Sequence, residues 1–132
     1  MKTTIALMMI LTILMGVVTA HAHHSVSALY DANRSIKIEG TIISFSFRSP
    51  HSLLIVEAPD VEGKMQRWDV AWNAARELAG QNINRESLKS GDKVVITGNP
   101  GRRAEDHIVR MVTFLRPSDG LSWGNRAGET FR

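Results

Sequence analysis

Apolar and polar side chains alternate along most of the chain after residue 35, and a period of two is the pattern of β-strands. The first run places apolar and small residues on one face: Ile36, Ile38, Gly40 and Ile42. From Ile43 the apolar positions shift by one residue and continue at Phe45 and Phe47. A change of phase indicates a β-bulge or sharp bend, which Gly40 would permit. The pattern therefore predicts one long, curved strand.

Four further strands and one short helix are predicted downstream. The strands cover residues 52–58, 66–72, 93–97 and 108–115. Trp68 and Trp72 share the inner face of the strand over residues 66–72 and are expected to fill the core. Residues 74–79 form the helix, with Asn73 as its N-cap and Gly80 as a left-handed stop.

Turn-forming residues separate these elements. One more helical turn is predicted over Asn84 to Lys89, and the run Gly98-Asn99-Pro100-Gly101 predicts a tight turn after the fourth strand. The loop that follows, Arg102 to Asp106, carries opposite charges that are expected to compensate each other, and Pro117 ends the last strand.

Three strands, a short helix and two strands, with a bent first strand, are the layout of the OB-fold. A bent strand can serve both halves of a closed barrel. We therefore predict an all-β fold with one short helix, a five-stranded OB-fold-like barrel. The alternative is an open β-meander or sandwich of the same strands.

The N-terminus has the three parts of an export signal. Lys2 precedes an apolar run from Ile5 to Val18, and Ala20-His21-Ala22 is a small-x-small cleavage site. The run is shorter than the ~18 residues of a spanning helix, so an uncleaved anchor is the minor alternative. We predict a signal peptide over 1–22, cleaved after Ala22, and a periplasmic protein without a stable membrane anchor.

The predicted mature chain divides into three parts. Residues 23–35 form a polar N-terminal arm, residues 36–116 the β-barrel domain, and residues 117–132 a C-terminal tail. The tail is rich in glycine and polar residues and is expected to follow the surface, anchored by a few apolar side chains: Leu121, Trp123 and Phe131.

Composition excludes several classes of function. The chain has no cysteine, so an exported form has neither disulfides nor thiolate ligands. Its formal charge of +3 falls to +2 when Lys2 is removed, which argues against a nucleic acid partner. Ser25, Ser49 and Ser52 lie near histidines, but no Gly-x-Ser-x-Gly elbow accompanies them. No catalytic residue and no enzymatic activity are expected.

Cleavage after Ala22 would make His23 the new N-terminus. A terminal histidine offers its amine, with an unperturbed pKa of about 7.7, and its imidazole, near 6.5, to one metal ion. His24 follows directly, and His51 stands at the start of the second strand after Pro50. Nitrogen ligands suit Cu(II) first and Zn(II) after it. The predicted metal ligands are His23, His24 and His51.

Structural explanations compete for each histidine. The His23-His24 pair is equally typical of a solvated arm, His51 of a residue that caps a turn, and His107 of a surface position. The metal hypothesis needs the arm to run back along the barrel. At about 3.3 Å per residue, the segment from His23 to Ile36 spans roughly 40 Å, which is enough to reach His51. We expect three residues to hold the arm on the barrel: Val26, Leu29 and Tyr30.

Several short segments of the chain match one known family: Ala22-His23-His24-Ser25, Tyr30-Asp31, Glu39-Gly40-Thr41-Ile42, Pro50-His51-Ser52, Leu88-Lys89-Ser90-Gly91-Asp92 with Val94 to Gly98, and Asp119-Gly120. In these segments the chain resembles the DUF6152 family, small exported bacterial proteins without an assigned activity. The resemblance implies an exported small β domain. The chain departs from the family at Ser49, where an asparagine is usual.

Two functions from different classes are consistent with these patterns. The first is an exported non-enzymatic β-barrel protein that binds a divalent metal, copper or zinc, through its histidine N-terminus. The second is a structural or interaction module that docks an envelope protein or glycan.

Overall fold

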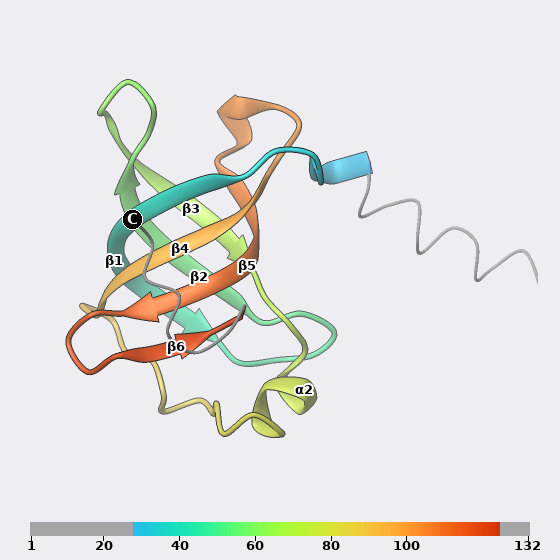
Figure 1. Cartoon of the computed structure of the whole chain (residues 1–132), viewed down its shortest axis with the longest axis vertical. Coiled ribbons are helices and arrows are strands. Elements are labelled where there is room, and N and C mark those ends of the chain that lie inside the picture. Colours follow the sequence, from blue (N-terminus) through green and yellow to red (C-terminus); the bar gives the residue numbers. More distant parts are fainter. Residues whose placement is uncertain (1–27, 125–132) are drawn as a thin grey trace, which may run out of the picture.

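The computed structural model describes residues 28–124, which form a six-stranded β-structure with one short helix (Figure 1). The elements are β1 (Ile36–Ser46), β2 (Leu53–Pro59), β3 (Met65–Ala71), α2 (Ala75–Ala79), β4 (Lys93–Pro100), the 3-10 turn η1 (Ala104–Asp106), β5 (Ile108–Arg116) and β6 (Leu121–Trp123).

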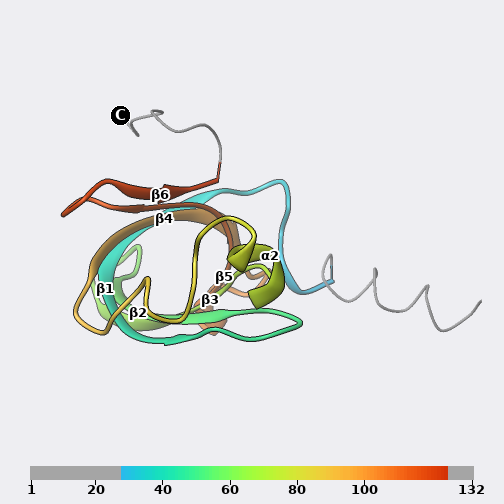
Figure 2. The same ribbon diagram turned by 90° about the horizontal axis from the view of Figure 1, so that it is seen from below.

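The sheet closes on itself. Its strands follow the order β3-β2-β1-β4-β5-β6, and β3 also pairs with β5 in parallel, from Asp69 with Ile108 to Ala71 with Arg110. Five strands thus form a ring, and β6 lies outside it, paired with β5 alone (Figure 2). This closure confirms the predicted barrel and excludes the open meander.

The predicted bend in β1 is confirmed. The pairing of β1 with β2 shifts register between Ile42 and Ser44, where the apolar pattern changes phase. The first half of β1 pairs with β4 and the second half with β2, and Thr41 pairs with both strands. Gly40 permits the curvature, since a Cβ there would press on Val56 at 2.9 Å.

The barrel interior holds one hydrophobic core. Trp68 and Trp72 are both buried, as predicted, and Trp72 stacks on Phe114 with ring centroids 5.7 Å apart. The other large, fully buried apolar side chains come from every long strand and from α2: Ile42, Leu54, Val56, Val70, Leu78, Val94, Ile96 and Val109.

The predicted turn at residues 98–101 is wrong. β4 continues through Gly98, Asn99 and Pro100, which pair with β5 across a register shift after Thr97. Gly98 lies in a crowded strand position and not in a turn: a Cβ there would contact Val109 Cγ1 at 2.5 Å. The chain reverses later, around η1. Glycine and proline therefore mark an irregular strand end here.

The predicted helix ends also need correction. The residue before α2 is Ala74, no side chain caps the helix, and Gly80 has a right-handed φ of −64°. The left-handed residue is Asn82, with φ of 62°. Residues 84–89 form turns and no helical turn, because the Asn84 side chain accepts a hydrogen bond from the Glu86 amide at 2.8 Å. Asn73 instead contributes its carbonyl, which accepts from the Ser52 amide at 3.0 Å.

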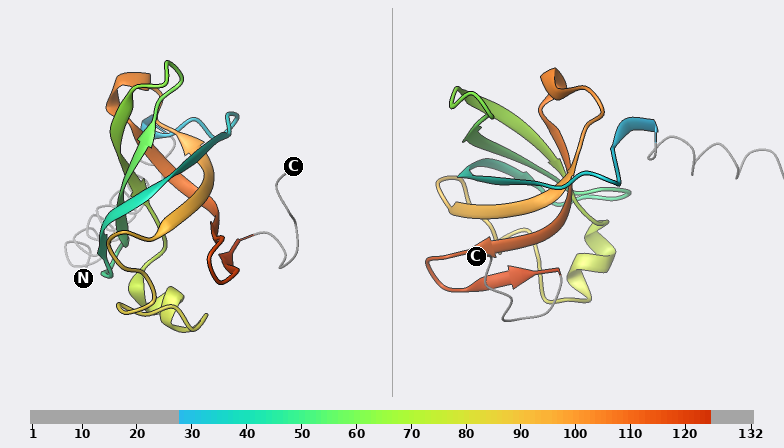
Figure 3. Two further views of the ribbon diagram at one scale, coloured as in Figure 1. Left: turned by 90° about the vertical axis from the view of Figure 1, so that its left-hand side faces the viewer. Right: turned by 45° about the horizontal axis from the view of Figure 1, so that its top comes forward.

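The barrel has two structurally different ends (Figure 3). The β2–β3 hairpin and η1 project at one end, and α2 lies at the other. In the η1 loop Arg103 pairs with Asp106 at 2.5 Å and with Glu105 at 3.8 Å, as the sequence predicts. β6 falls inside the segment assigned to a surface tail and adds a strand that was not predicted. Within residues 28–124, no helix is long and apolar enough to span a membrane.

Candidate functional site

The last part of the N-terminal arm is bound along the end of β4. The Leu29 carbonyl accepts from the Arg102 amide at 3.1 Å, Tyr30 forms a β-bridge with Gly101, and the Asp31 amide donates to the Pro100 carbonyl at 2.9 Å. Leu29 stays 48% exposed, whereas Tyr30 is half-buried. Tyr30 therefore packs against the barrel, as expected, whereas Leu29 is attached through its carbonyl and leaves much of its side chain exposed. Val26 lies outside the described residues.

His51 stands on a loop that its neighbour Ser52 fixes to the barrel. Ser52 is fully buried, and its hydroxyl donates to the Arg48 carbonyl at 3.2 Å. The Ser52 carbonyl accepts from the Trp72 amide at 2.9 Å, which ties the loop to the chain entering α2. The His51 side chain is exposed and makes no hydrogen bond to any residue in 28–124. A fixed backbone thus presents a free imidazole.

A hollow of about 480 Å³ lies beside His51, where β3 and β5 part after Ala71. We call it the seam hollow. Its walls carry polar groups from four separate segments, and burial raises the pKa of the Tyr30 hydroxyl, with Arg110 and Asp69 acting in opposite directions. The side chains that the hollow brings together include Leu29, Tyr30, His51, Asn73, Glu77 and Arg110.

The structure brings together only part of the predicted metal site. His51 shares the seam hollow with Leu29 and Tyr30, the arm residues nearest the predicted N-terminus. His23 and His24 lie outside the described residues. Within residues 28–124, no three histidine, aspartate or glutamate side chains are grouped for a metal ion.

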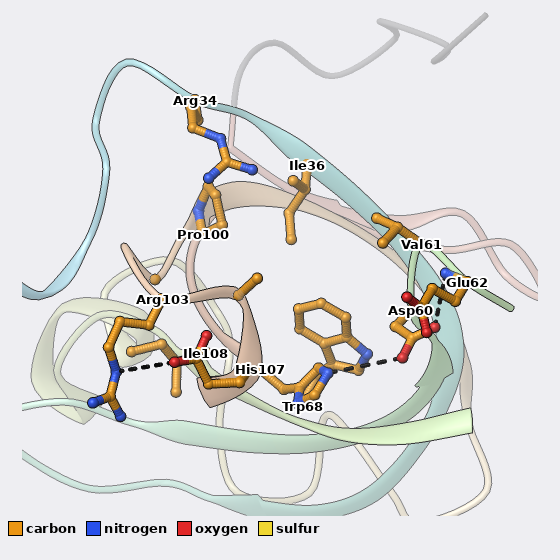
Figure 4. Close-up of a pocket in the computed structure, with 13 residues that line it drawn as sticks. Arg34, Ile36, Asp60, Val61, Glu62, Trp68, Pro100, Arg103, His107 and Ile108 are labelled. Atoms are coloured by element: carbon orange, nitrogen blue, oxygen red, sulfur yellow. Dashed lines mark hydrogen bonds and ion pairs between the residues drawn. The ribbon is translucent and has the colours of Figure 1, made fainter. Parts of the chain in front are cut away.

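A second hollow, of about 320 Å³, opens at the other end of the barrel (Figure 4). We call it the mouth hollow. Trp68 forms its floor, with its indole N–H donating to the Ala58 carbonyl at 3.2 Å. The His107 ring meets Trp68 edge to face, with ring centroids 5.0 Å apart. The start of β1, the β2–β3 turn and the η1 loop supply the rim.

Asp60 organises one side of the mouth hollow. Its carboxylate accepts from the Glu62 amide at 2.9 Å, the Lys64 amide at 3.0 Å and the Gln66 side chain at 3.0 Å. His107 Nε2 lies 4.0 Å from the Asp60 Oδ2 atom. The hydrogen bond from Gln66 and these further contacts hold the pKa of Asp60 below its usual range. Asp60 therefore stays ionised and holds the turn in shape.

The mouth hollow was not predicted from the sequence. The pattern around His107 predicts a surface position, yet its side chain is only 22% exposed and its backbone has a left-handed φ of 47°. The Asp69 amide donates to the His107 carbonyl at 3.0 Å, so the β3–β5 pairing places this residue beside Trp68. No local pattern predicts that pairing. A histidine in the tight reversal before a buried strand was the one available signal.

The chain is a small closed β-barrel protein with an extra edge strand and two hollows, the mouth hollow and the seam hollow. A family model described as a family of unknown function, DUF6152, matches residues 11–110. The chain therefore belongs to the DUF6152 family, which confirms the resemblance. No curated protein and no solved structure matches the chain.

Proposed function

We propose that this protein is an exported, non-enzymatic β-barrel protein that binds a divalent metal, Cu(II) or Zn(II), at the seam hollow. The ligands are the amine and ring of a mature N-terminal His23 together with the His51 ring, and His24 is the alternative third ligand. Export to the periplasm is part of the proposal, because only cleavage after Ala22 frees the amine of His23.

One observation carries the proposal: the arm and His51 meet at the same hollow. Leu29 and Tyr30 line it on one side and His51 on another. Residues 24 to 28 are four steps of chain, which reach about 13 Å when extended. That reach is long enough to cross a hollow with a volume of about 480 Å³. The contacts of Tyr30 with Gly101 and of Asp31 with Pro100 support the proposal, because they hold this part of the arm beside the hollow.

The chemistry of His51 favours a ligand role over a structural one. Its neighbour Ser52 makes the hydrogen bonds that hold the loop, so the His51 ring is not needed for that purpose. A metal ligand profits from a backbone fixed in this way, because less conformational entropy is lost on binding. A site made of one imidazole and two further amine or imidazole nitrogens binds Cu(II) more tightly than Zn(II).

A metal titration on the mature protein tests the proposal. The N-terminus is first verified by intact mass, and Cu(II) is then titrated against a competing chelator. We expect one tight site, with nitrogen hyperfine structure in the electron paramagnetic resonance spectrum. His51→Ala should weaken Cu(II) binding about tenfold or more, since it removes one ligand. Zn(II) should bind at the same site more weakly.

Two controls make the result specific. His107→Ala removes a histidine at the opposite end of the barrel and should leave the affinity unchanged. Acetylation of the His23 amine removes the terminal chelate but keeps every ring, and it should weaken binding as His51→Ala does. Equal affinities for all four proteins, or an intact mass that starts elsewhere than His23, would overturn the proposal.

A second candidate, an interaction module for an envelope protein, is favoured by a different observation. The β2–β3 hairpin exposes Val61 almost completely and Met65 by 55%. Exposed apolar side chains at a projecting tip are typical of contact surfaces. The double change Val61→Ser and Met65→Ser should then abolish partner capture and leave copper or zinc tolerance intact. His51→Ala should do the reverse if metal binding is the function.

A further inference from the structure

The mouth hollow separates opposite charges across an apolar floor. Trp68, only 7% exposed, forms the floor together with Ile36 and Ile108. In Figure 4 the Arg34 side chain lies on one side of the Trp68 indole, and Asp60 and Glu62 lie on the other. The hollow is therefore dipolar and has an aromatic centre.

Most of the other charges around this hollow are already compensated. Arg103 is paired with Asp106 and Glu105 in the η1 loop. Asp60 is held by Gln66, two backbone amides and His107. Two charged groups remain without a partner among residues 28–124: the Arg34 guanidinium and the Glu62 carboxylate. They come from different elements, the end of the arm and the β2–β3 turn.

We propose that the mouth hollow binds a small molecule with an anionic end and a cationic end joined by a short apolar chain, the class of the ω-aminocarboxylates. The ligand carboxylate bonds the Arg34 guanidinium, for which a planar fork of donors is well suited. The ligand ammonium lies at Glu62, beside the negative charge of Asp60. Its methylene chain covers Trp68 and Ile36.

A dipolar ligand fits better than a simple anion or cation. A plain carboxylate would meet Arg34 but would leave its other end near two carboxylates, and a plain amine would leave Arg34 unpaired. An α-amino acid with an uncharged side chain carries both charges on one carbon and cannot reach both sides of Trp68. Exposed ion pairs each add little, so binding is expected to be weak and to depend on both ends together.

Three probes of one chain length test the idea: 6-aminohexanoate, hexanoate and hexylamine. Each is titrated into ¹⁵N-labelled full-length protein in chelator-treated buffer, so that metal plays no part. The Trp68 indole N–H signal should shift with 6-aminohexanoate, and the Trp72 and Trp123 signals should stay in place. We expect 6-aminohexanoate to bind about fivefold more tightly than either single-charge probe.

Two substitutions assign the ends. Arg34→Gln should reduce the affinity for 6-aminohexanoate and hexanoate but not for hexylamine, and Glu62→Gln should reduce that for 6-aminohexanoate and hexylamine but not for hexanoate. Arg76→Gln, on α2 at the other end of the barrel, is the matched control and should change none of them. Equal affinities for the three probes, shifts centred away from Trp68, or no saturation at about 50 mM would each overturn the proposal.

Discussion

Gly98 lies where β4 and β5 approach closely. A methyl group in its place would press against the Arg110 carbonyl oxygen and would contact Val109 Cγ1 at 2.5 Å. Gly80, after α2, is different: its φ of −64° suits any residue, and the nearest atom to an added Cβ is the Glu77 carbonyl oxygen at 3.4 Å. The fold therefore leaves no room for a Cβ at position 98 but accepts one at position 80.

This difference predicts opposite effects of the same substitution. Gly98→Ala should lower the free energy of unfolding by about 2 kcal/mol, because the strands must move apart. Gly80→Ala should leave it unchanged or raise it by about 0.5 kcal/mol, because the unfolded chain loses freedom. Urea unfolding of the two variants and the unsubstituted protein measures both values. A similar loss in both would show that the close contact at Gly98 is not what requires glycine.

β6 is joined to the barrel by its pairing with β5 and by its aromatic side chain. The strand has three residues and pairs with β5 only. Its Trp123 meets Trp72 edge to face, with centroids 5.3 Å apart, and its indole N–H donates to Gln81 Oε1. One side chain thus connects β6, the loop after α2 and the core.

Trp123→Ala should therefore lower the free energy of unfolding by about 2 kcal/mol, since a half-buried aromatic contact is lost. Val61→Ala, at a side chain that is 99% exposed, should change it by less than about 0.5 kcal/mol. Thermal unfolding followed by circular dichroism compares the two. A loss no larger for Trp123→Ala than for Val61→Ala would mean that β6 is not coupled to the core.

For the whole molecule, Arg116 connects three segments at the α2 end of the barrel. Its guanidinium donates to Asp92 Oδ2 at 2.6 Å, to Asp119 Oδ2 at 2.7 Å and to the Ser87 carbonyl at 2.8 Å. The bond from Arg116 lowers the pKa of Asp119 to about 2. Burial raises the pKa of Asp92, but the hydrogen bonds from the Lys89 amide and Arg116 have the larger combined effect. The pKa of Asp92 therefore lies below its usual range.

The lowered pKa values of Asp92 and Asp119 should make the folded protein less stable at acid pH. A carboxylate whose folded pKa is depressed stabilises the fold fully above its unfolded pKa, near 3.9, and that contribution is lost as pH falls toward the folded value. The melting temperature should therefore drop between about pH 4 and pH 2. Arg116→Gln should lower it at neutral pH and make the drop smaller. Part of the drop should remain, because the pKa values of Asp60 and Asp106 are also lowered.

The control for this experiment is Arg76→Gln, which changes an exposed arginine of α2. It should leave the melting temperature and its pH dependence as they are. If Arg116→Gln left the acid transition as steep as before, the carboxylates bound by Arg116 would not be responsible for it.

The strands, the bend in β1 and the two core tryptophans could be predicted from the sequence, because alternation and its change of phase depend only on near neighbours. His51 was also identified as a candidate ligand from its place beside Pro50. Element ends were less well predicted. Gly98 and Pro100 continue β4 because they pair with β5, a distant segment, and Gly80 takes an ordinary right-handed φ of −64°. β6 was missed because three residues carry too little periodicity.

Only the tertiary structure decided which groups meet. Closure of the barrel through β3 and β5 sets His107 against Trp68 and within 4.0 Å of Asp60, and the arm adds Arg34 to the same hollow. The same closure opens the seam at which Tyr30 lies with His51. Such meetings follow from pairing between segments far apart in the chain. No local pattern of side chains contains that information, because the free energy that selects it comes from burying the whole core at once.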